Sequence, residues 1–270
     1  MSGTEAPGSV LAGCAIVMAH PDDEMLFASS VLSRAAKVIL AFGPQGNATV
    51  TEGRRRAEAE FPLNTAEFLN LTEAGAMNRA AWPNPERTEA GLAITRPGLG
   101  LSRPAEARYR ANFDALCRML PERLAGITDV VTHNPWGEYG HEDHVLVFRA
   151  VTEVQKTLGF KVWVTSYVAP KPMALMRAEW PNLGAPTADL PTDKALAKDL
   201  MQLYIRHNCW TWHYDYIWPE TERFFPWLPG HGQPVSACIQ PMNILPDVTV
   251  APMAARIAGK VWRMLSARFK

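Results

Sequence analysis

The sequence predicts an α/β fold in which helices flank a mostly parallel sheet, followed by an irregular, aromatic-rich C-terminal extension. The first observation is a βαβ unit, formed by an apolar run at residues 14–18, a helical stretch and a second apolar run at residues 37–42. Strands that are joined through a helix pair in parallel within one sheet. The second observation is that the order of strand, polar loop and helix recurs at residues 127–157, so both polar loops should leave the same edge of the sheet.

Composition and charge fit one large globular domain. The chain has 270 residues, of which 47% are hydrophobic and 20% are charged, and this balance allows a sizeable core. Its 27 Lys and Arg residues equal its 27 Asp and Glu residues, so no overall field predicts a nucleic acid partner. We expect a single domain over residues 1–250, with its core at about 13–170 and the extension at about 171–250, and then a helix over residues 251–270.

No stretch of the sequence has the features of an export signal or a membrane span. Residues 1–13 lack a basic segment followed by a long apolar run, and no other apolar run has the length that a bilayer requires. The four cysteines, at positions 14, 117, 209 and 238, are widely spaced and form no CxxC pair, so we expect reduced thiols. Together these observations predict a cytoplasmic protein.

The N-terminal half of the chain supplies the first predicted elements. Residues 14–18 are a strand, a helix follows to about residue 36, and residues 37–42 form the second strand before Gly43 and Pro44 end it. After a loop rich in Gly, Asn and Thr, a helix is expected from about Glu52 to Phe68. Residues 75–103 are irregular, and we expect this insertion to shape the mouth of a pocket.

The middle of the chain repeats the pattern. Apolar residues at helical spacing predict a helix over 106–124, and residues 127–132 form another buried strand. A helix over 145–157 and a strand over 161–168 follow.

The last third begins with a proline-rich connector at 170–191 and a helix over 192–206 that Thr192 or Asp193 caps. The aromatic residues of 208–227 either form a small core, which we favour, or stack on sugar faces. The basic amphipathic helix expected at 254–270 either packs on the protein, which we favour, or makes peripheral contact with a membrane. The oligomeric state stays open.

The first polar loop, Ala19-His20-Pro21-Asp22-Asp23-Glu24, concentrates a histidine and three carboxylates at the end of a strand. Ionised side chains at this density cost free energy unless a divalent cation neutralises them. The alternative is a solvated acidic turn that caps a helix.

The second polar loop, at residues 133–144, brings further histidines to the same edge of the sheet. His20, Asp23 and His144 form a candidate ligand set, and two imidazoles with one carboxylate suit zinc (Zn²⁺), although iron (Fe²⁺) could serve in the cell. Asp22 is the natural base for a water on the metal, and Asp143 could orient an imidazole. His141 could protonate a leaving amine, and Tyr139 could donate to an oxyanion. The alternative for His141 and His144 is that both cap a surface helix.

The motifs of the two polar loops are similar to those of a known family. Ala19-His20-Pro21-Asp22-Asp23-Glu24 followed by Tyr139-Gly140-His141-Glu142-Asp143-His144 resembles the LmbE-like or PIG-L family of zinc-dependent de-N-acetylases. The resemblance implies a Rossmann-like fold and a hydrolase that removes an N-acetyl group from an N-acetylglucosamine-type sugar, which would be its partner. It implies that His20, Asp23 and His144 are the metal ligands, that Asp22 is the base and that His141 and Tyr139 stabilise the oxyanion.

The resemblance also places an arginine and a glutamate on the second helix. Arg55 and Glu58 match this pair, and we expect both to contact substrate, together with Trp136 from the second polar loop. Beyond about residue 170 the family pattern fades, so a free, nucleotide-linked, lipid-linked or metabolite-linked sugar stays open. Two other functions compete with this one: a sugar-nucleotide glycosyltransferase, and a catalytically inactive carbohydrate-binding relative.

Overall fold

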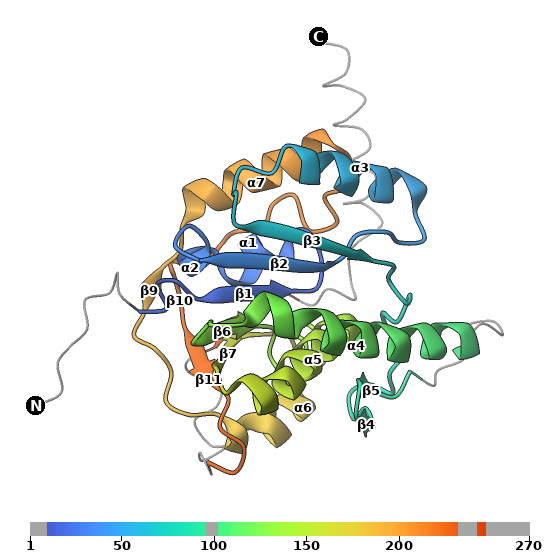
Figure 1. Ribbon diagram of the computed structural model, residues 1–270, viewed down its shortest axis with the longest axis vertical. Coiled ribbons are helices and arrows are strands. Elements are labelled where there is room, and N and C mark those ends of the chain that lie inside the picture. The colour runs from blue at the N-terminus through green and yellow to red at the C-terminus, as the bar shows by residue number, and fades with distance from the viewer. Residues whose placement is uncertain (1–9, 95–101, 232–241, 247–270) are drawn as a thin grey trace, which may run out of the picture.

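The computed structural model describes residues 10–94, 102–231 and 242–246. Its centre is a six-stranded sheet in the order β11-β7-β6-β1-β2-β3, in which all neighbours are parallel except β11 and β7 (Figure 1). The strands are β1 (Ala15–Met18), β2 (Lys37–Phe42), β3 (Ala66–Leu71), β6 (Asp129–Thr132), β7 (Lys161–Thr165) and β11 (Phe224–Pro226). The predicted α/β class is therefore confirmed.

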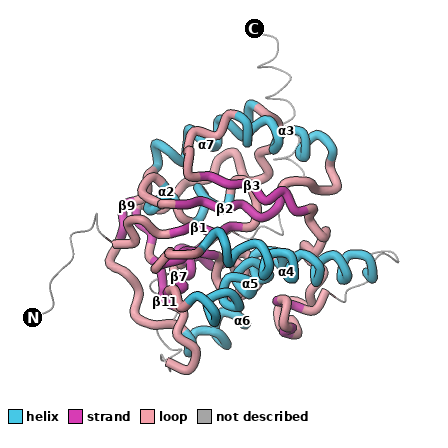
Figure 2. Tube along the Cα trace, viewed as in Figure 1, coloured by secondary structure: helices cyan, strands magenta, loops and turns pink. Residues whose placement is uncertain are grey.

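Helices cover both faces of this sheet (Figure 2). One layer contains α1 (Asp23–Phe27), α2 (Ser29–Leu32), α3 (Ala48–Ala59) and α7 (Lys194–Arg206). The other contains α4 (Ser102–Leu124), α5 (Glu142–Leu158), α6 (Met173–Glu179) and the 3₁₀ turn η1 (Trp180–Asn182). Because side chains alternate along a strand, Ile16 and Met18 pack into the first layer, whereas Ala15 and Val17 pack into the second. The sheet thus separates two hydrophobic cores.

Among the described residues, three pairs of short strands lie outside this sheet. They are β4 (Arg87–Thr88) with β5 (Gly91–Leu92), β8 (Tyr167–Val168) with β12 (Asn243–Ile244), and β9 (Leu190–Pro191) with β10 (Thr221–Glu222). A cavity of about 300 Å³ lies between the β4–β5 hairpin, α5 and α6, where Arg87, Phe148 and Leu175 line it. The predicted insertion therefore does border a cavity, but none of His20, Asp22, Asp23 and His144 lines it.

Several element boundaries differ from the predictions. The helix expected to reach Phe68 ends at Ala59, because Pro62 disfavours helical backbone at Phe61, and the strand β3 follows instead. The first helix breaks at Ala28, whose φ of −144° separates α1 from α2. The strand expected over 161–168 divides, since Tyr167 pairs with β12 and leaves the main sheet. The connector at 170–191 contains α6 and η1.

Other elements match their predictions closely. The apolar stripe of α4, from Tyr109 to Leu124, is buried in the second core. Asp193 caps α7, because its Oδ1 accepts the backbone N–H of Leu196 over 3.0 Å.

The aromatic segment joins the body of the protein. Trp210, Trp218, Phe224 and Phe225 are buried. Trp212, Tyr216 and Trp227 are partly buried and pack against the cores, so most of the aromatic side chains belong to the core as favoured. Ile217, by contrast, is 84% exposed.

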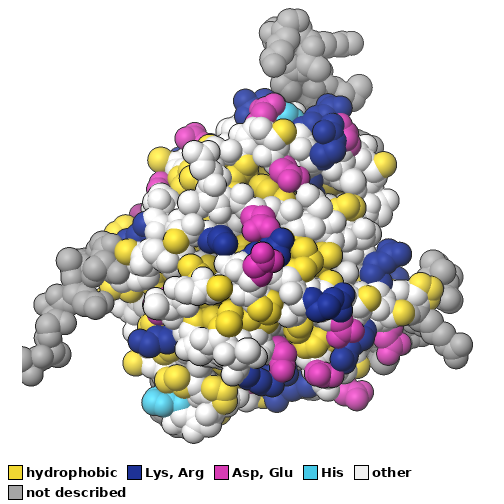
Figure 3. All heavy atoms as spheres, viewed as in Figure 1, with side chains coloured by type: hydrophobic (Ala, Val, Ile, Leu, Met, Phe, Trp, Pro, Cys, Tyr) yellow, Lys and Arg dark blue, Asp and Glu magenta, His cyan; other side chains and the backbone are white. Residues whose placement is uncertain are grey.

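The visible surface mixes charges of both signs without a single-sign patch (Figure 3). Among the described residues, no helix is both long and apolar enough to cross a bilayer. The helix expected at 254–270, Cys238 and residues 1–9 lie outside the described residues.

Candidate metal centre and active site

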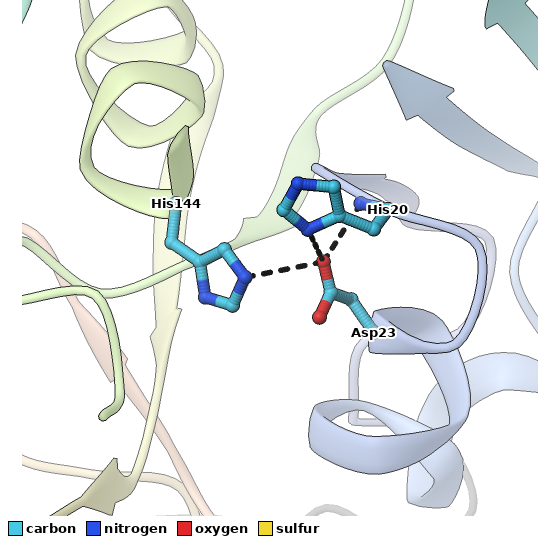
Figure 4. A group of neighbouring side chains, drawn as sticks. All are labelled: His20, Asp23 and His144. Atoms are coloured by element: carbon cyan, nitrogen blue, oxygen red, sulfur yellow. Dashed lines mark hydrogen bonds and ion pairs between the residues drawn. The ribbon is translucent and has the colours of Figure 1, made fainter. Parts of the chain in front are cut away.

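The two polar loops meet because β1 and β6 are parallel neighbours. The first loop follows β1 and leads into α1, while the second follows β6 and leads into α5. Asp23 Oδ2 lies 3.1 Å from His20 Nδ1 and 3.3 Å from His144 Nε2 (Figure 4). These three residues offer ligand atoms that all lie within 4.8 Å of one another. The structure therefore brings the predicted ligand set together, although which atoms bind a metal stays a prediction.

The donor set fits a divalent metal. His20 Nε2 and His144 Nε2 are buried without a hydrogen-bond partner, and a buried polar atom in that state is costly unless something else satisfies it. Burial opposes the charged forms, but the charges of Asp23 and then Glu138 raise the pKa of His144 to about 9. His144 and His20 in turn hold the pKa of Asp23 well below its usual range despite burial. Without a metal, protons on the histidines therefore compensate the negative charge of the carboxylates in this cluster.

Asp22 stands beside the ligands in a restrained conformation. Its φ is 123°, its backbone N–H donates to Glu24 Oε2 over 2.9 Å, and its Oδ2 accepts Thr211 Oγ1 over 2.8 Å. Burial, and then the charge of Asp23, raise the pKa of Asp22 to about 7. A carboxylate with such a pKa is suited to act as a general base near neutral pH.

Glu24 anchors this turn. Tyr204 on α7 donates to Glu24 Oε1 over 2.7 Å, and burial raises the pKa of Glu24 to about 8. Glu24 thereby connects the first polar loop to α7.

His141 both caps α5 and faces the cluster. Its Nδ1 accepts the backbone N–H of Asp143 over 3.1 Å, so the neutral ring carries its proton on Nε2. Its ring centroid lies 4.8 Å from that of His20 and 4.7 Å from that of His144. Burial, and then His144 and His20, lower the pKa of His141 well below its usual range. The helix-cap alternative is thus realised at His141, but in a buried position rather than on the surface.

Tyr139 and Asp143 also border the cluster. The Tyr139 ring packs edge-on against His141, with centroids 5.7 Å apart. Asp143 Oδ2 lies 3.5 Å from His20 Nε2, while its Oδ1 has no hydrogen-bond partner. His144 is oriented by Glu138 instead, whose Oε2 lies 2.7 Å from His144 Nδ1.

The structure corrects the predicted arginine. Arg55 is exposed and pairs with Glu52, and Glu58 accepts a hydrogen bond from the Asn70 side chain on β3. Arg54 is the buried arginine, because the inward face of α3 carries Gly53, Arg54 and Ala57. Arg54 donates to Glu73 and to the carbonyl of Gly43, and Glu73 Oε1 lies 3.7 Å from His20 Nε2.

The structure also corrects the predicted contact through Trp136. Its side chain is 0% exposed and packs in the second core, where its Nε1–H donates to the carbonyl of Tyr167 over 2.8 Å. A wholly buried ring leaves no surface for a substrate.

Sequence reasoning missed three parts of the site. Thr211 is 189 positions from Asp22 and no local pattern connects them. Glu138 and His133 belong to the second polar loop, and their place at the end of a strand indicates that they lie near the site. Their position alone does not distinguish them from solvated loop residues. Both are 0% exposed.

The chain is similar to known proteins in sequence and in fold. The model of a family described as PIG-L, GlcNAc-PI de-N-acetylase, matches residues 15–155, which include both polar loops. The zinc-inhibited form of teicoplanin deacetylase Orf2 is 12% identical with a TM-score of 0.50, over 79% of this chain and 97% of that chain. This likeness shows a shared fold.

Two further solved structures are similar at lower scores. A deacetylase–teicoplanin complex is 13% identical with a TM-score of 0.46, over 80% of this chain and 97% of that chain. The A40926 pseudoaglycone deacetylase Dbv21 is 12% identical with a TM-score of 0.43, over 82% of this chain and 100% of that chain. A comparison with curated proteins found no match.

Proposed function

The chain belongs to the PIG-L family of de-N-acetylases, and we propose that it removes the N-acetyl group from an N-acetylglucosamine-type amino sugar, releasing acetate and a free amine. The family is one of amide hydrolases, so the glycosyltransferase alternative loses its support. One observation carries the proposal: His20, Asp23 and His144 converge with unpartnered imidazole nitrogens beside the buried carboxylate of Asp22.

We propose zinc as the metal, with Fe²⁺ as the alternative. Two imidazoles and one carboxylate are a common ligand set for catalytic zinc, and they leave a position open for water. When bound, the metal would supply Lewis acidity that polarises the acetyl carbonyl and lowers the pKa of a water molecule.

The residues of the chain would then handle the protons. Asp22 takes a proton from the attacking water, and the Thr211 hydroxyl holds the Asp22 carboxylate in place through its 2.8 Å hydrogen bond. The neutral His141 donates a hydrogen bond from its Nε2 to the developing oxyanion, and the proton that Asp22 has taken passes to the amine nitrogen as the C–N bond breaks. Tyr139, beside His141, is the proposed donor to the developing oxyanion. Water thus adds to the acetyl carbon, and the nitrogen leaves as a neutral amine.

A substrate-panel assay tests this proposal. Zinc-loaded protein is incubated with free, nucleotide-linked and lipid-linked N-acetylglucosamine, and released acetate is measured with a coupled enzyme. We expect acetate from at least one compound, loss of release after chelation, and recovery on adding the metal back. If the reconstituted protein releases no acetate from any member, or if release survives chelation, the proposal fails.

A further inference from the structure

Glu138 is wholly buried in the second polar loop and stands at a φ of 50°, in the left-handed region. Two donors reach its Oε2: His133 Nδ1 over 3.0 Å and His144 Nδ1 over 2.7 Å. Two more reach its Oε1: the backbone N–H of Asn134 over 3.0 Å and the hydroxyl of Thr165. Because a carboxylate offers about four acceptor sites, these donors saturate Glu138.

The neighbouring hydrogen bonds decide where the protons lie on the two imidazoles. The backbone N–H of Ala19 donates to His133 Nε2 over 2.8 Å, so the neutral His133 ring must carry its proton on Nδ1, toward Glu138. His144 Nδ1 faces the same acceptor-only oxygen and must also carry a proton. When His144 carries a single ring proton, its lone pair is therefore on Nε2, the atom 3.3 Å from Asp23 Oδ2.

His133, Glu138 and His144 could themselves be considered as a second metal site, since their ligand atoms lie close together. The hydrogen bonds argue against this. A cation on the two Nδ1 atoms would have to displace both protons, yet the Ala19 N–H already occupies the other nitrogen of His133. The hydrogen-bonded arrangement accounts for all four donors that surround Glu138.

We infer that Glu138 is a positioning residue that aligns both loops of the metal centre. Through His144 it turns a ligand nitrogen toward the cluster. Through His133 it holds the backbone of Ala19, the residue before His20, against the end of β6. One carboxylate therefore sets the relative placement of ligands that are 124 positions apart in the sequence (20 and 144). Partners of this kind behind a ligating histidine commonly increase metal affinity by roughly 10–100-fold.

This inference rests on the proposed function only for the identity of the metal site, and its test needs no substrate. The zinc dissociation constant of Glu138→Gln is measured by competition with a chromogenic chelator and compared with that of the wild type. A glutamine can accept but cannot replace both oxygens, so we expect affinity to fall about 10–100-fold. The visible spectrum of the Co²⁺-loaded variant should also change, because the orientation of the His144 ring changes.

Glu222→Gln is the matched control. Glu222 is another wholly buried glutamate, and it accepts the Ser30 N–H and the Tyr167 hydroxyl, whereas the imidazoles of His133 and His144 bond to Glu138. We expect this control to lower stability while the zinc dissociation constant and the Co²⁺ spectrum stay at their wild-type values. Equal zinc affinity for Glu138→Gln and the wild type would overturn the inference, as would an equal loss of affinity in both variants.

A measurement on the wild type keeps the inference testable if Glu138→Gln does not fold. Long-range ¹H–¹⁵N spectra of the zinc-loaded protein, labelled at histidine, report which ring nitrogen carries the proton. We expect His133 and His144 to hold the proton on Nδ1, the less common form of a free imidazole. A proton on Nε2 of His144 or of His133 would refute it. Absence of acetate release from every substrate would leave these affinities and spectra unchanged, so the two proposals can fail separately.

Discussion

Replacing Thr211 with valine removes one hydrogen bond from the proposed base and keeps the shape of the side chain. Thr211 is exposed, whereas Asp22, which accepts its hydroxyl over 2.8 Å, is only 4% exposed. Because water already reaches position 211, valine opens no cavity there. We therefore expect the free energy of unfolding to fall by about 1 kcal/mol at most, which is the contribution of the lost hydrogen bond.

The loss of the same hydrogen bond should also slow catalysis. A hydrogen bond to a charged group contributes roughly 1.5–3 kcal/mol when buried, and the exposure of Thr211 places its bond below that range, at about 1 kcal/mol. Since a tenfold rate change corresponds to about 1.4 kcal/mol, kcat/KM should fall roughly fivefold. Loss of the same hydrogen bond should also change how kcat/KM depends on pH.

The direction of that pH change follows from the charged form of Asp22. The Thr211 hydrogen bond favours the carboxylate and so lowers its pKa, against burial and Asp23, which raise it to about 7. Removing the bond raises the pKa further, by less than about one unit for a loss of about 1 kcal/mol. Because the base acts as the carboxylate, activity disappears as the pH falls through this pKa. The acidic limb of kcat/KM should therefore move to higher pH.

The assay is acetate release by the zinc-loaded variant, measured on both sides of neutrality with the best substrate of the panel. Thr211→Ser keeps the hydroxyl and should follow the wild-type profile. If Thr211→Val gives the wild-type kcat/KM and the wild-type acidic limb, the reasoning that this hydroxyl supports the base is refuted.

Three further predictions use other parts of the structure. Asp22→Asn should keep bound metal but lose turnover, whereas His144→Ala should lose both; undiminished acetate release by Asp22→Asn would rule out the assigned base. Cys14 and Cys209 should resist alkylation in the native protein at mildly alkaline pH, because burial raises the pKa of each thiol to about 12, and peptide mapping that finds either one modified would contradict this. Gly53→Ala should destabilise the protein by roughly 1–3 kcal/mol in denaturant unfolding, because a Cβ there would lie 2.2 Å from the carbonyl oxygen of His207; an unchanged midpoint would show that α3 and α7 can separate freely.

Local patterns predicted the parts of this site that depend on sequence neighbours. His20, Asp22 and Asp23 are adjacent at a strand end, and His144 is three residues from His141, so strand order alone brings them together. The register of three consecutive arginines could not be predicted in this way. Only the packing of Gly53 and Ala57 against the body of the protein turns Arg54 inward and leaves Arg55 in solvent.

The remaining errors arise from long-range contacts. Nothing near Thr211 indicates that it meets Asp22, since the loop after α7 is placed by tertiary packing and not by its own pattern. Glu138 reads as a solvated loop residue until the partners that surround it are known, among them Thr165 at the end of β7. The strand β3 contains Ala66, Glu67 and Leu69, which favour a helix, and Pro62 was the available signal that the preceding helix ends before it.

The antiparallel strand β11 has a consequence for how the chain is made. Its residues, Phe224–Pro226, are the outermost strand of the sheet and cover the backbone of β7, whose own residues are synthesised about sixty positions earlier. While the intervening chain leaves the ribosome, β7 presents an uncovered edge that can pair with another molecule. A nascent or truncated chain that stops before Phe224 would therefore be prone to aggregate even though both polar loops are complete. Solubility of this protein during synthesis depends on its last third, whereas the three proposed metal ligands all lie in the first two.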